Sequence, residues 1–126
     1  MKKHKICIVG GGLTGLITAY VLREEGLDID LIVENTKFKN KDSRVTAISD
    51  KNFEFIKSSL KKTDLKLFYA VQKVDLFFEN NNQINNFLNF DENKNLMFFF
   101  ENRLMKEYLV KLLKKTKIKV QEKTVN

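Results

Sequence analysis

The sequence lacks several features that would point directly to a function. Its single cysteine, Cys7, excludes an internal disulfide, so we expect a reducing, cytoplasmic location. Cys7 stands within an apolar run, which favours a small core residue over a reactive thiol. The single histidine, His4, belongs to the basic N-terminus, and no cluster of residues has the spacing of a metal site. We therefore expect no bound metal.

Long hydrophobic runs are also missing. After the basic residues 1–5, the first apolar run ends at Gly10 after four residues, which is too short for a signal peptide. No segment has the ~18 consecutive apolar residues of a transmembrane helix. The sequence thus predicts no transmembrane segment, and peripheral contact is the closest association with a membrane that it allows.

Acidic residues are fewer than basic ones. The 126 residues include 23 Lys and Arg against 16 Asp and Glu, giving a net charge of +7. Such a chain can attract nucleic acid or anionic membranes. The lysines are spread along the whole length, however, so we interpret them as a solvated surface and expect no nucleic-acid partner. The length itself corresponds to one domain, residues 1–126.

The hydrophobic pattern of the first 34 residues predicts an α/β unit. Residues 5–9 are a short segment whose last four residues are apolar, which is typical of a fully buried parallel strand. Residues 14–25 show helical spacing, and Gly26 stands at the position of a helix C-cap. Residues 27–34 alternate apolar and polar side chains, which predicts a second strand ending at Glu34.

The rest of the chain continues with mixed elements. We interpret residues 35–49 as a loop or extended segment. Residues 50–62 are predicted to form a helix with Phe53, Ile56 and Leu60 on one side. Four further elements are predicted: an antiparallel strand pair over 70–79 and 83–90 joined by a loop of several residues, a strand over 96–100, an amphipathic helix over 102–115 with Asn102 as its N-cap, and a strand over 117–122.

A glycine-rich motif connects the first strand to the first helix. The run from Gly10 to Gly15 fits the pattern G-x-G-x-x-G, in the strand–turn–helix–strand context that this pattern requires. Gly10 permits the tight turn, Gly12 lets a pyrophosphate approach the backbone, and Gly15 lets the helix pack closely on the strand. The motif therefore predicts a Rossmann-like dinucleotide site.

The residues around these glycines complete the predicted site. The backbone N–H groups of the first helical turn, which contains Leu13 and Thr14, would face the phosphates. Glu34 follows Gly15 by 19 positions, and its carboxylate can accept hydrogen bonds from a ribose diol while repelling the 2′-phosphate of NADP. FAD and NAD both satisfy this pattern. A glycine-rich turn that binds nothing, with Glu34 merely at the surface, is the alternative.

Two later motifs carry a family resemblance. They are Asp42–Ser49, with the letters DSRVTAIS, and Phe100–Leu104, with the letters FENRL. In this order after the glycine motif they resemble the flavin-dependent aromatic hydroxylases, most closely the ubiquinone-biosynthesis branch, whose members show D-x-R-x-x-A-[LI]-S and E-N-R-x-L. The resemblance covers essentially the whole chain and implies that the dinucleotide is FAD.

The resemblance also implies roles for two arginines. In that family the arginine matching Arg44 lies beside the flavin, and the one matching Arg103 helps to hold FAD near its phosphates. A guanidinium can pair with a diphosphate through two hydrogen bonds. From the residues alone, Arg44 would be a solvated loop arginine, and Arg103 would form a surface pair with Glu107 one helical turn later.

The intact family implies a reaction and its partners. Its members are FAD-dependent monooxygenases that hydroxylate an aromatic ring with electrons from NAD(P)H. The implied substrate is an aromatic quinone precursor, and the implied setting is the cytoplasm, at the inner membrane surface. The sequence shows no acid–base pair that could be assigned to catalysis, so no catalytic residue is predicted.

The family continues well beyond this length, with later D-G and G-D motifs that are absent here. We therefore expect an N-terminal FAD-binding portion: a truncated three-layer Rossmann-like domain with a small antiparallel β appendage, in which residues of about 70–100 begin a substrate-side sheet. A completing chain or segment is an implied partner. Two alternatives stay open, another FAD- or NAD-dependent oxidoreductase and a non-catalytic nucleotide-binding fragment, and enzymatic activity of the chain alone is not predicted.

Overall fold

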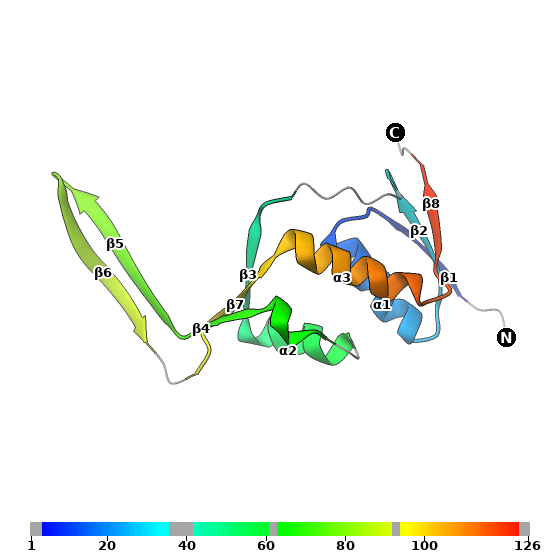
Figure 1. Ribbon diagram of the computed structural model, residues 1–126, viewed down its shortest axis with the longest axis horizontal. Coiled ribbons are helices and arrows are strands. Elements are labelled where there is room, and N and C mark those ends of the chain that lie inside the picture. Colours follow the sequence, from blue (N-terminus) through cyan, green and yellow to red (C-terminus); the bar gives the residue numbers. More distant parts are fainter. Residues whose placement is uncertain (1–3, 36–41, 61–62, 92–93, 124–126) are drawn as a thin grey trace. The chain divides into compact units, whose positions relative to one another are not determined.

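The structure is a computed structural model that describes residues 4–35, 42–60, 63–91 and 94–123 (Figure 1). It contains two compact units. Unit 1 comprises Met1–Arg44 and Glu101–Asn126, and unit 2 comprises Val45–Phe100. The chain thus leaves unit 1 after Arg44 and returns to it at Glu101.

Unit 1 is an α/β structure around a parallel sheet of three strands in the order β1-β2-β8. Leu31 of β2 lies opposite Ile8 of β1 on one side and Val120 of β8 on the other. Helices connect the parallel strands, which is the arrangement of a Rossmann-like half. The α/β class is therefore confirmed. The elements are β1 (Lys5–Val9), α1 (Leu13–Glu24), β2 (Asp28–Val33), α3 (Asn102–Lys114) and β8 (Lys119–Glu122).

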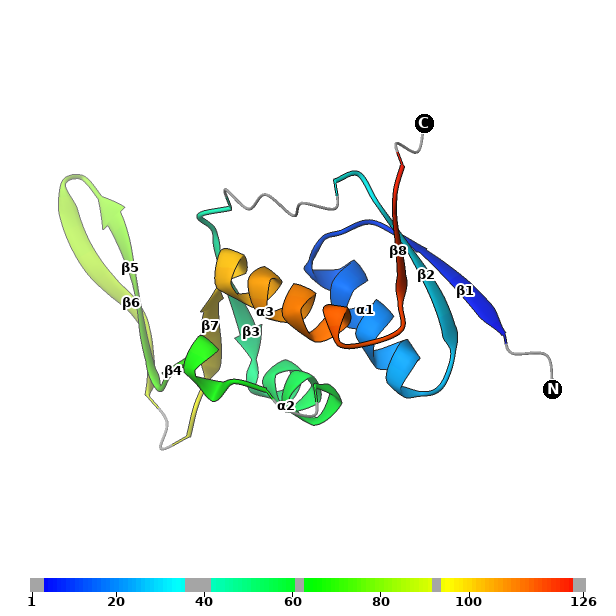
Figure 2. The same ribbon diagram turned by 45° about the vertical axis from the view of Figure 1, so that its right-hand side comes forward.

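The core of unit 1 lies between this sheet and its two helices. In both ribbon views α1 and α3 lie on the same side of the sheet (Figure 2). Period-two alternation turns every second side chain of β2 toward them. Within the described residues, the sheet therefore carries one helical layer. The buried side chains are Leu16, Ala19 and Tyr20 from α1, Ile29, Leu31 and Val33 from β2, and Met105, Leu109 and Leu113 from α3.

The opposite face of the sheet is open in this structure. Val9 is 60% exposed, and Cys7 is exposed as well. The predictions of a strand buried on both faces over residues 5–9 and of a core position for Cys7 are therefore wrong. The reason is the alternation of β1, in which Ile6 and Ile8 are the partly buried residues and the side chains between them face away.

Unit 2 contains a small sheet in the order β3-β7-β4. Aromatic rings contact one another beside this sheet: the rings of Phe53 and Phe98 stack with centroids 3.7 Å apart, and Phe68 meets Phe53 edge-on at 5.0 Å. Ser49 caps α2 by accepting a hydrogen bond from the backbone N–H of Asn52 at 3.3 Å. The elements are β3 (Val45–Ser49), α2 (Asp50–Ser59), the 3-10 helix η1 (Leu65–Leu67), β4 (Tyr69–Val71) and β7 (Met97–Glu101).

An antiparallel hairpin completes unit 2. It consists of β5 (Lys73–Asn80) and β6 (Gln83–Asp91), which pair along their whole length. The predicted loop of several residues is instead a two-residue turn, because Asn81 and Asn82 both adopt positive φ, at 49° and 60°. Asparagine tolerates this conformation, and such turns match the twist of the strands they join.

Most predicted elements are present, with shifts of one to three residues at their ends, and Val45–Ser49 of the segment predicted as a loop or extended form strand β3 beside β7. Two details are corrected. The predicted strand over residues 70–79 is divided, because Tyr69–Val71 form β4, which pairs with β7, whereas Lys73–Asn80 form β5 of the hairpin. Asn102 does not cap α3: Glu101 occupies the N-cap position without a side-chain cap hydrogen bond, and Asn102 is the first helical residue. Residues 36–41 and 61–62 of the predicted segments lie outside the described residues.

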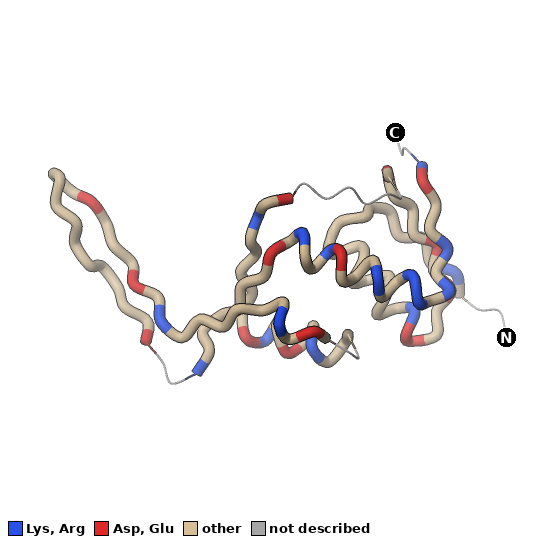
Figure 3. Tube along the Cα trace, in the orientation of Figure 1, with Lys and Arg blue, Asp and Glu red and all other residues tan. Residues whose placement is uncertain are grey.

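Charged residues are distributed over both units (Figure 3). The last turn of α3 carries Lys111 and Lys114, where positive charge is favourable beside the negative end of the helix dipole. Within the described residues, no helix is both long enough and apolar enough to cross a membrane. In the same part of the chain, no group of three or more His, Cys, Asp or Glu side chains is placed to hold a metal ion.

Candidate cofactor site

Most of the predicted site residues of unit 1 share one edge of its sheet. The glycine motif follows the carboxyl end of β1, and Glu34 follows the carboxyl end of β2 with an exposed side chain. Helix α3 leads into β8, which is parallel to β2, so the start of α3 points to the same edge. Arg103, in the first turn of α3, therefore lies at this edge as well. Ligands of parallel α/β sheets bind outside the carboxyl ends of the strands.

The turn after β1 is built on glycine for two physical reasons. Gly10 adopts a φ of +122°, which other residues rarely reach, while its N–H still donates to the carbonyl of Ile32 at 2.8 Å. A Cβ on Gly15 would overlap the carbonyl oxygen of Gly10. Gly15 thus brings the start of α1 into close contact with the end of β1, as the motif predicts.

Gly12 has a different role, because nothing would obstruct a side chain there. It occupies the N-cap of α1 with an ordinary extended backbone (φ −78°, ψ 175°), and an added Cβ would meet no atom within 4 Å. The missing Cβ therefore leaves space on the outer side of the turn. A diphosphate must approach the backbone closely at this position, and the open space at Gly12 allows it to do so. The turn therefore fits a dinucleotide.

The start of α1 presents donors to that space. Leu16 is the first residue whose N–H bonds back into the helix, to the carbonyl of Gly12 at 3.0 Å. The preceding N–H groups, those of Leu13, Thr14 and Gly15, have no acceptor in their own helix. Within the described residues no side chain caps this end, and its first turn carries no acidic residue. The helix dipole thus favours an anion here.

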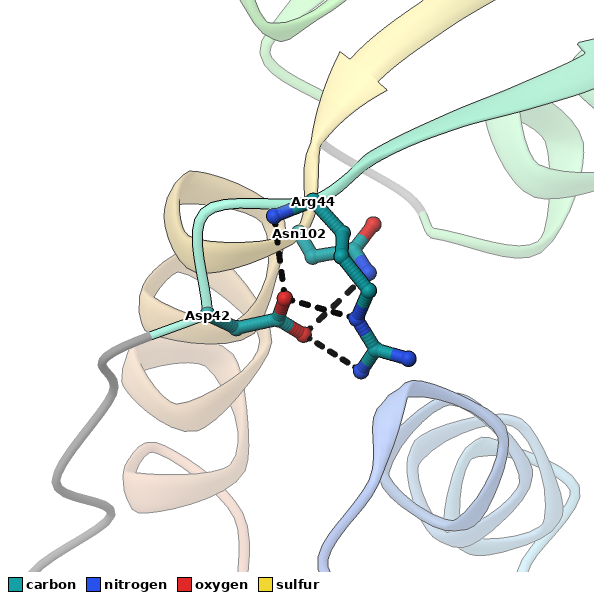
Figure 4. Close-up of polar contacts among 3 residues, drawn as sticks. All are labelled: Asp42, Arg44 and Asn102. Atoms are coloured by element: carbon teal, nitrogen blue, oxygen red, sulfur yellow. Dashed lines mark hydrogen bonds and ion pairs between the residues drawn. The ribbon is translucent and has the colours of Figure 1, made fainter.

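Arg44 is held by a carboxylate two residues earlier (Figure 4). Asp42 accepts hydrogen bonds from Nε of Arg44 at 2.8 Å, from Nη2 at 2.7 Å and from its backbone N–H at 3.0 Å. Hydrogen bonds from Arg44, joined by one from Asn102, hold the pKa of the Asp42 carboxyl well below its usual range. The carboxylate in turn raises the pKa of Arg44. The side chain of Arg44 is nevertheless 80% exposed, so its outer edge faces solvent.

Arg103 lies in the first turn of α3 between two carboxylates. Its Nη1 donates to Oε1 of Glu107 at 3.1 Å, and its Nη2 lies 3.9 Å from Oε2 of Glu101. The surface pair with Glu107 that the spacing predicts is thus present. Side chains of this kind exchange partners at little cost. A cofactor contact of Arg103 stays a prediction.

Two polar contacts of the site were not predicted from the sequence. The spacing of Asp42 and Arg44 contains a usable signal, since an aspartate often accepts the backbone N–H two residues later. No sequence signal links Asp42 to Asn102, which is 60 positions away and donates to it from Nδ2 at 3.2 Å. Such a contact follows only from the fold.

The fold and the glycine turn define a dinucleotide-binding domain. Comparison with known families then specifies the dinucleotide. The family model described as an FAD binding domain matches residues 3–124, so the chain belongs to this FAD-binding family, and its cofactor is FAD. No curated protein matches the chain by sequence.

Solved structures share the fold. The tetrameric form of 2-methyl-3-hydroxypyridine-5-carboxylic acid oxygenase superimposes with a TM-score of 0.75 at 15% identity, over 96% of this chain and 32% of that one. For 2,6-dihydroxypyridine-3-hydroxylase from Arthrobacter nicotinovorans the TM-score is 0.67 at 12% identity, over 94% and 29%. For p-nitrophenol 4-monooxygenase from Pseudomonas putida the TM-score is 0.64 at 18% identity, over 94% and 31%. The chain spans about a third of each of these proteins.

Proposed function

We propose that this chain is the FAD-binding portion of a flavin-dependent monooxygenase that hydroxylates an aromatic ring. The observation that carries the proposal is the start of α1, where uncapped backbone donors face the space left by Gly12. The membership in the FAD-binding family supports it, and so do the similar folds of an oxygenase, a hydroxylase and a monooxygenase.

Each predicted residue has a task in this proposal. Gly10 and Gly15 shape the turn, and Gly12 with the N–H groups of Leu13 and Thr14 receives the diphosphate. Glu34 accepts hydrogen bonds from the ribose. Arg44 lies beside the flavin. Arg103 releases its hydrogen bond to Glu107 and donates to the phosphates of FAD instead. Bound FAD supplies the redox chemistry, while these residues bind and orient it.

The substrate proposed is an aromatic quinone precursor of ubiquinone biosynthesis, with NAD(P)H as the electron donor. Support comes from the order of the three motifs along the chain, the glycine motif followed by Asp42–Ser49 and Phe100–Leu104. The hydroxylation would take place in the cytoplasm, at the inner membrane surface, where an amphipathic precursor is accessible. A completing chain or segment would supply the rest of the substrate site, with residues of about 70–100 as the start of its sheet.

The test is FAD binding by the purified chain, measured as quenching of flavin fluorescence. We expect micromolar affinity, which corresponds to about −8 kcal/mol. Gly12→Val should weaken binding at least about tenfold, because the new side chain occupies the space for the diphosphate, where an added Cβ meets no atom within 4 Å. Thr18→Val is the matched control, since it adds the same residue type at an exposed position of α1.

The outcomes separate the proposal from its alternatives. Equal FAD affinity of the Gly12→Val and Thr18→Val variants would show that the cofactor does not bind at this turn. Tighter binding of NAD than of FAD would favour a different oxidoreductase. NAD(P)H oxidation above a free-flavin control would exclude a non-catalytic fragment.

A further inference from the structure

The Asp42 carboxylate joins two segments that are distant in sequence. On one side it holds Arg44, and on the other it accepts a hydrogen bond from the side chain of Asn102. We propose that Asp42 and Asn102 are positioning residues that fix the guanidinium of Arg44 for two neighbouring oxygen atoms of the bound cofactor. This inference rests on the FAD-binding function proposed above, and adds to it two residues that do not themselves touch FAD.

The geometry of the pair leaves a defined part of Arg44 available. A guanidinium has five N–H donors in one plane, arranged as a side-on edge at Nε and an end-on edge between the two Nη atoms. Asp42 takes the side-on edge through Nε and Nη2. The end-on edge can therefore bind a second pair of oxygens while the first pair stays in place. In the close-up this edge points toward the side where the ribbon of α1 begins (Figure 4).

Asn102 fixes the other end of this arrangement. Its Nδ2 donates to Oδ2 of Asp42 at 3.2 Å, and its backbone N–H donates to the carbonyl of Arg44 at 3.0 Å. Asn102 is 7% exposed and is the one buried polar residue among the described parts of the chain. It thus anchors the segment 42–44 at two points, where the chain leaves unit 1 and where it returns.

The exposure of the pair indicates a role in binding more than in stability. An ion pair as exposed as that of Arg44 contributes little to folding. A long arginine side chain, however, loses conformational freedom when it binds a ligand, and a side chain that is already held loses less. Asp42 also neutralises the charge of Arg44. The contribution to binding therefore comes from the orientation of donors, and not from net attraction.

The matching chemistry is a pair of neighbouring acceptor oxygens. FAD offers such a pair in its diphosphate, and its flavin ring offers a comparable pair of acceptors in the C2 carbonyl oxygen and the adjacent ring nitrogen N1. Binding of ADP, which contains only the diphosphate half, distinguishes the two sources. If disrupting the hydrogen bond between Asp42 and Asn102 weakens the binding of both FAD and ADP, the contact of Arg44 is with the diphosphate. If it weakens the binding of FAD alone, the contact is with the flavin.

The decisive experiment is a double-mutant cycle on the affinity of the chain for FAD. Asn102→Ala removes the side-chain hydrogen bond but keeps the backbone bond, and should raise the Kd about three- to tenfold, as expected for one hydrogen bond of ordinary net strength. In an Arg44→Ala background the same change should have no further effect, because the two residues act as one unit. Asp42→Asn should behave like Asn102→Ala, and Asp42→Glu should restore part of the affinity.

Two controls keep the cycle specific. Asp64→Asn removes an equally local aspartate, which accepts a backbone N–H, that of Lys66 at 3.1 Å, and it should leave the Kd unchanged. Measurements at about 0.5 M salt screen the charge that Asp42→Asn removes, while hydrogen-bond geometry is little affected. An affinity change that persists there reports on orientation.

A second measurement does not depend on FAD. The Nε–H of Arg44 should give a slowly exchanging cross-peak in ¹H–¹⁵N spectra, and this signal should disappear in Asp42→Asn and weaken in Asn102→Ala. An unchanged signal in Asn102→Ala, or equal losses of affinity with and without Arg44, would overturn the positioning role. If the signal behaves as expected but the wild-type chain does not bind FAD, the proposed FAD-binding function is wrong. The role of Asp42 and Asn102 in cofactor binding is then wrong as well.

Discussion

Two regions of this protein use similar apolar residues in opposite ways. In unit 1, Leu16, Leu31 and Leu109 are fully buried between the sheet and its helices. In the hairpin β5–β6, Phe77, Ile84 and Phe87 are 60%, 76% and 69% exposed. The difference shows that apolar content does not determine burial. A strand pair buries its side chains only where another layer covers it, and an isolated hairpin is of marginal stability.

The hairpin is nevertheless well defined by its local interactions. Its pairs Val74 with Phe90 and Leu76 with Leu88 lie directly opposite one another, and the register shifts after Leu76. Beyond the shift, the rings of Phe78 and Phe87 meet edge-on with centroids 6.2 Å apart. Such cross-strand pairs contribute a few tenths of a kcal/mol to about 1 kcal/mol each. The geometry of the hairpin thus comes from pairing, whereas the geometry of unit 1 comes from packing.

The strongest test of this difference in burial is the same substitution, leucine to alanine, in both regions. Leu109→Ala in α3 should lower the free energy of unfolding by about 2–5 kcal/mol, because it leaves a cavity in a fully buried position. Leu88→Ala in β6 should cost about 0.5 kcal/mol or less, since this leucine is 41% exposed. Urea unfolding followed by circular dichroism measures both. Similar losses for the two variants would mean that the hairpin is covered in solution.

A smaller effect tests how closely unit 1 is packed at its glycine turn. Gly15→Ala should destabilise the chain by about 1–3 kcal/mol, because its Cβ overlaps the backbone of Gly10 and cannot be relieved by a side-chain movement. Gly12→Ala should change stability by less than about 0.5 kcal/mol, since its Cβ enters open space on an ordinary backbone. The melting temperatures of the two single-methyl variants provide the measurement. If both variants melt like the wild type, the close contact at Gly15 does not exist in solution.

The contrast between the regions also explains which elements of the fold could be predicted from the sequence. The strand–glycine turn–helix–strand order was predictable because each glycine has a local reason, visible at Gly10 in its φ of +122°. The hairpin strands were predictable from their β-type residues, but the turn at Asn81 and Asn82 was predicted to be longer than it is. Strand β3 was predicted only as a loop or extended segment, because its neighbour in the sheet, β7, is distant in sequence.

The candidate site shows the same division. The glycines and Glu34 follow from a motif with a physical explanation, and the structure places them at the carboxyl edge of the sheet together with the start of α3. The partners of Arg44 did not follow from the sequence. Asn102 was predicted to be a helix cap, whereas the fold buries it against Asp42, where its amide serves a distant carboxylate. Contacts between distant segments are the information that periodicity lacks.

The smallest predicted effect compares one aspartate of each unit as the pH falls. Hydrogen bonds from Arg44 lower the pKa of Asp42 in the folded chain, so its contribution to stability is fully present above the unfolded pKa of about 3.9 and is lost as the pH falls below it. The melting temperature of the wild type should therefore drop more steeply between about pH 5 and pH 2 than that of Asp42→Asn. Asp64→Asn removes a carboxylate that accepts a backbone N–H, and its melting curve should follow the wild type. If Asp42→Asn instead parallels the wild type throughout this range, the bonds to Arg44 are not maintained in solution, and the outer edge of that guanidinium has no fixed direction in which to meet a cofactor.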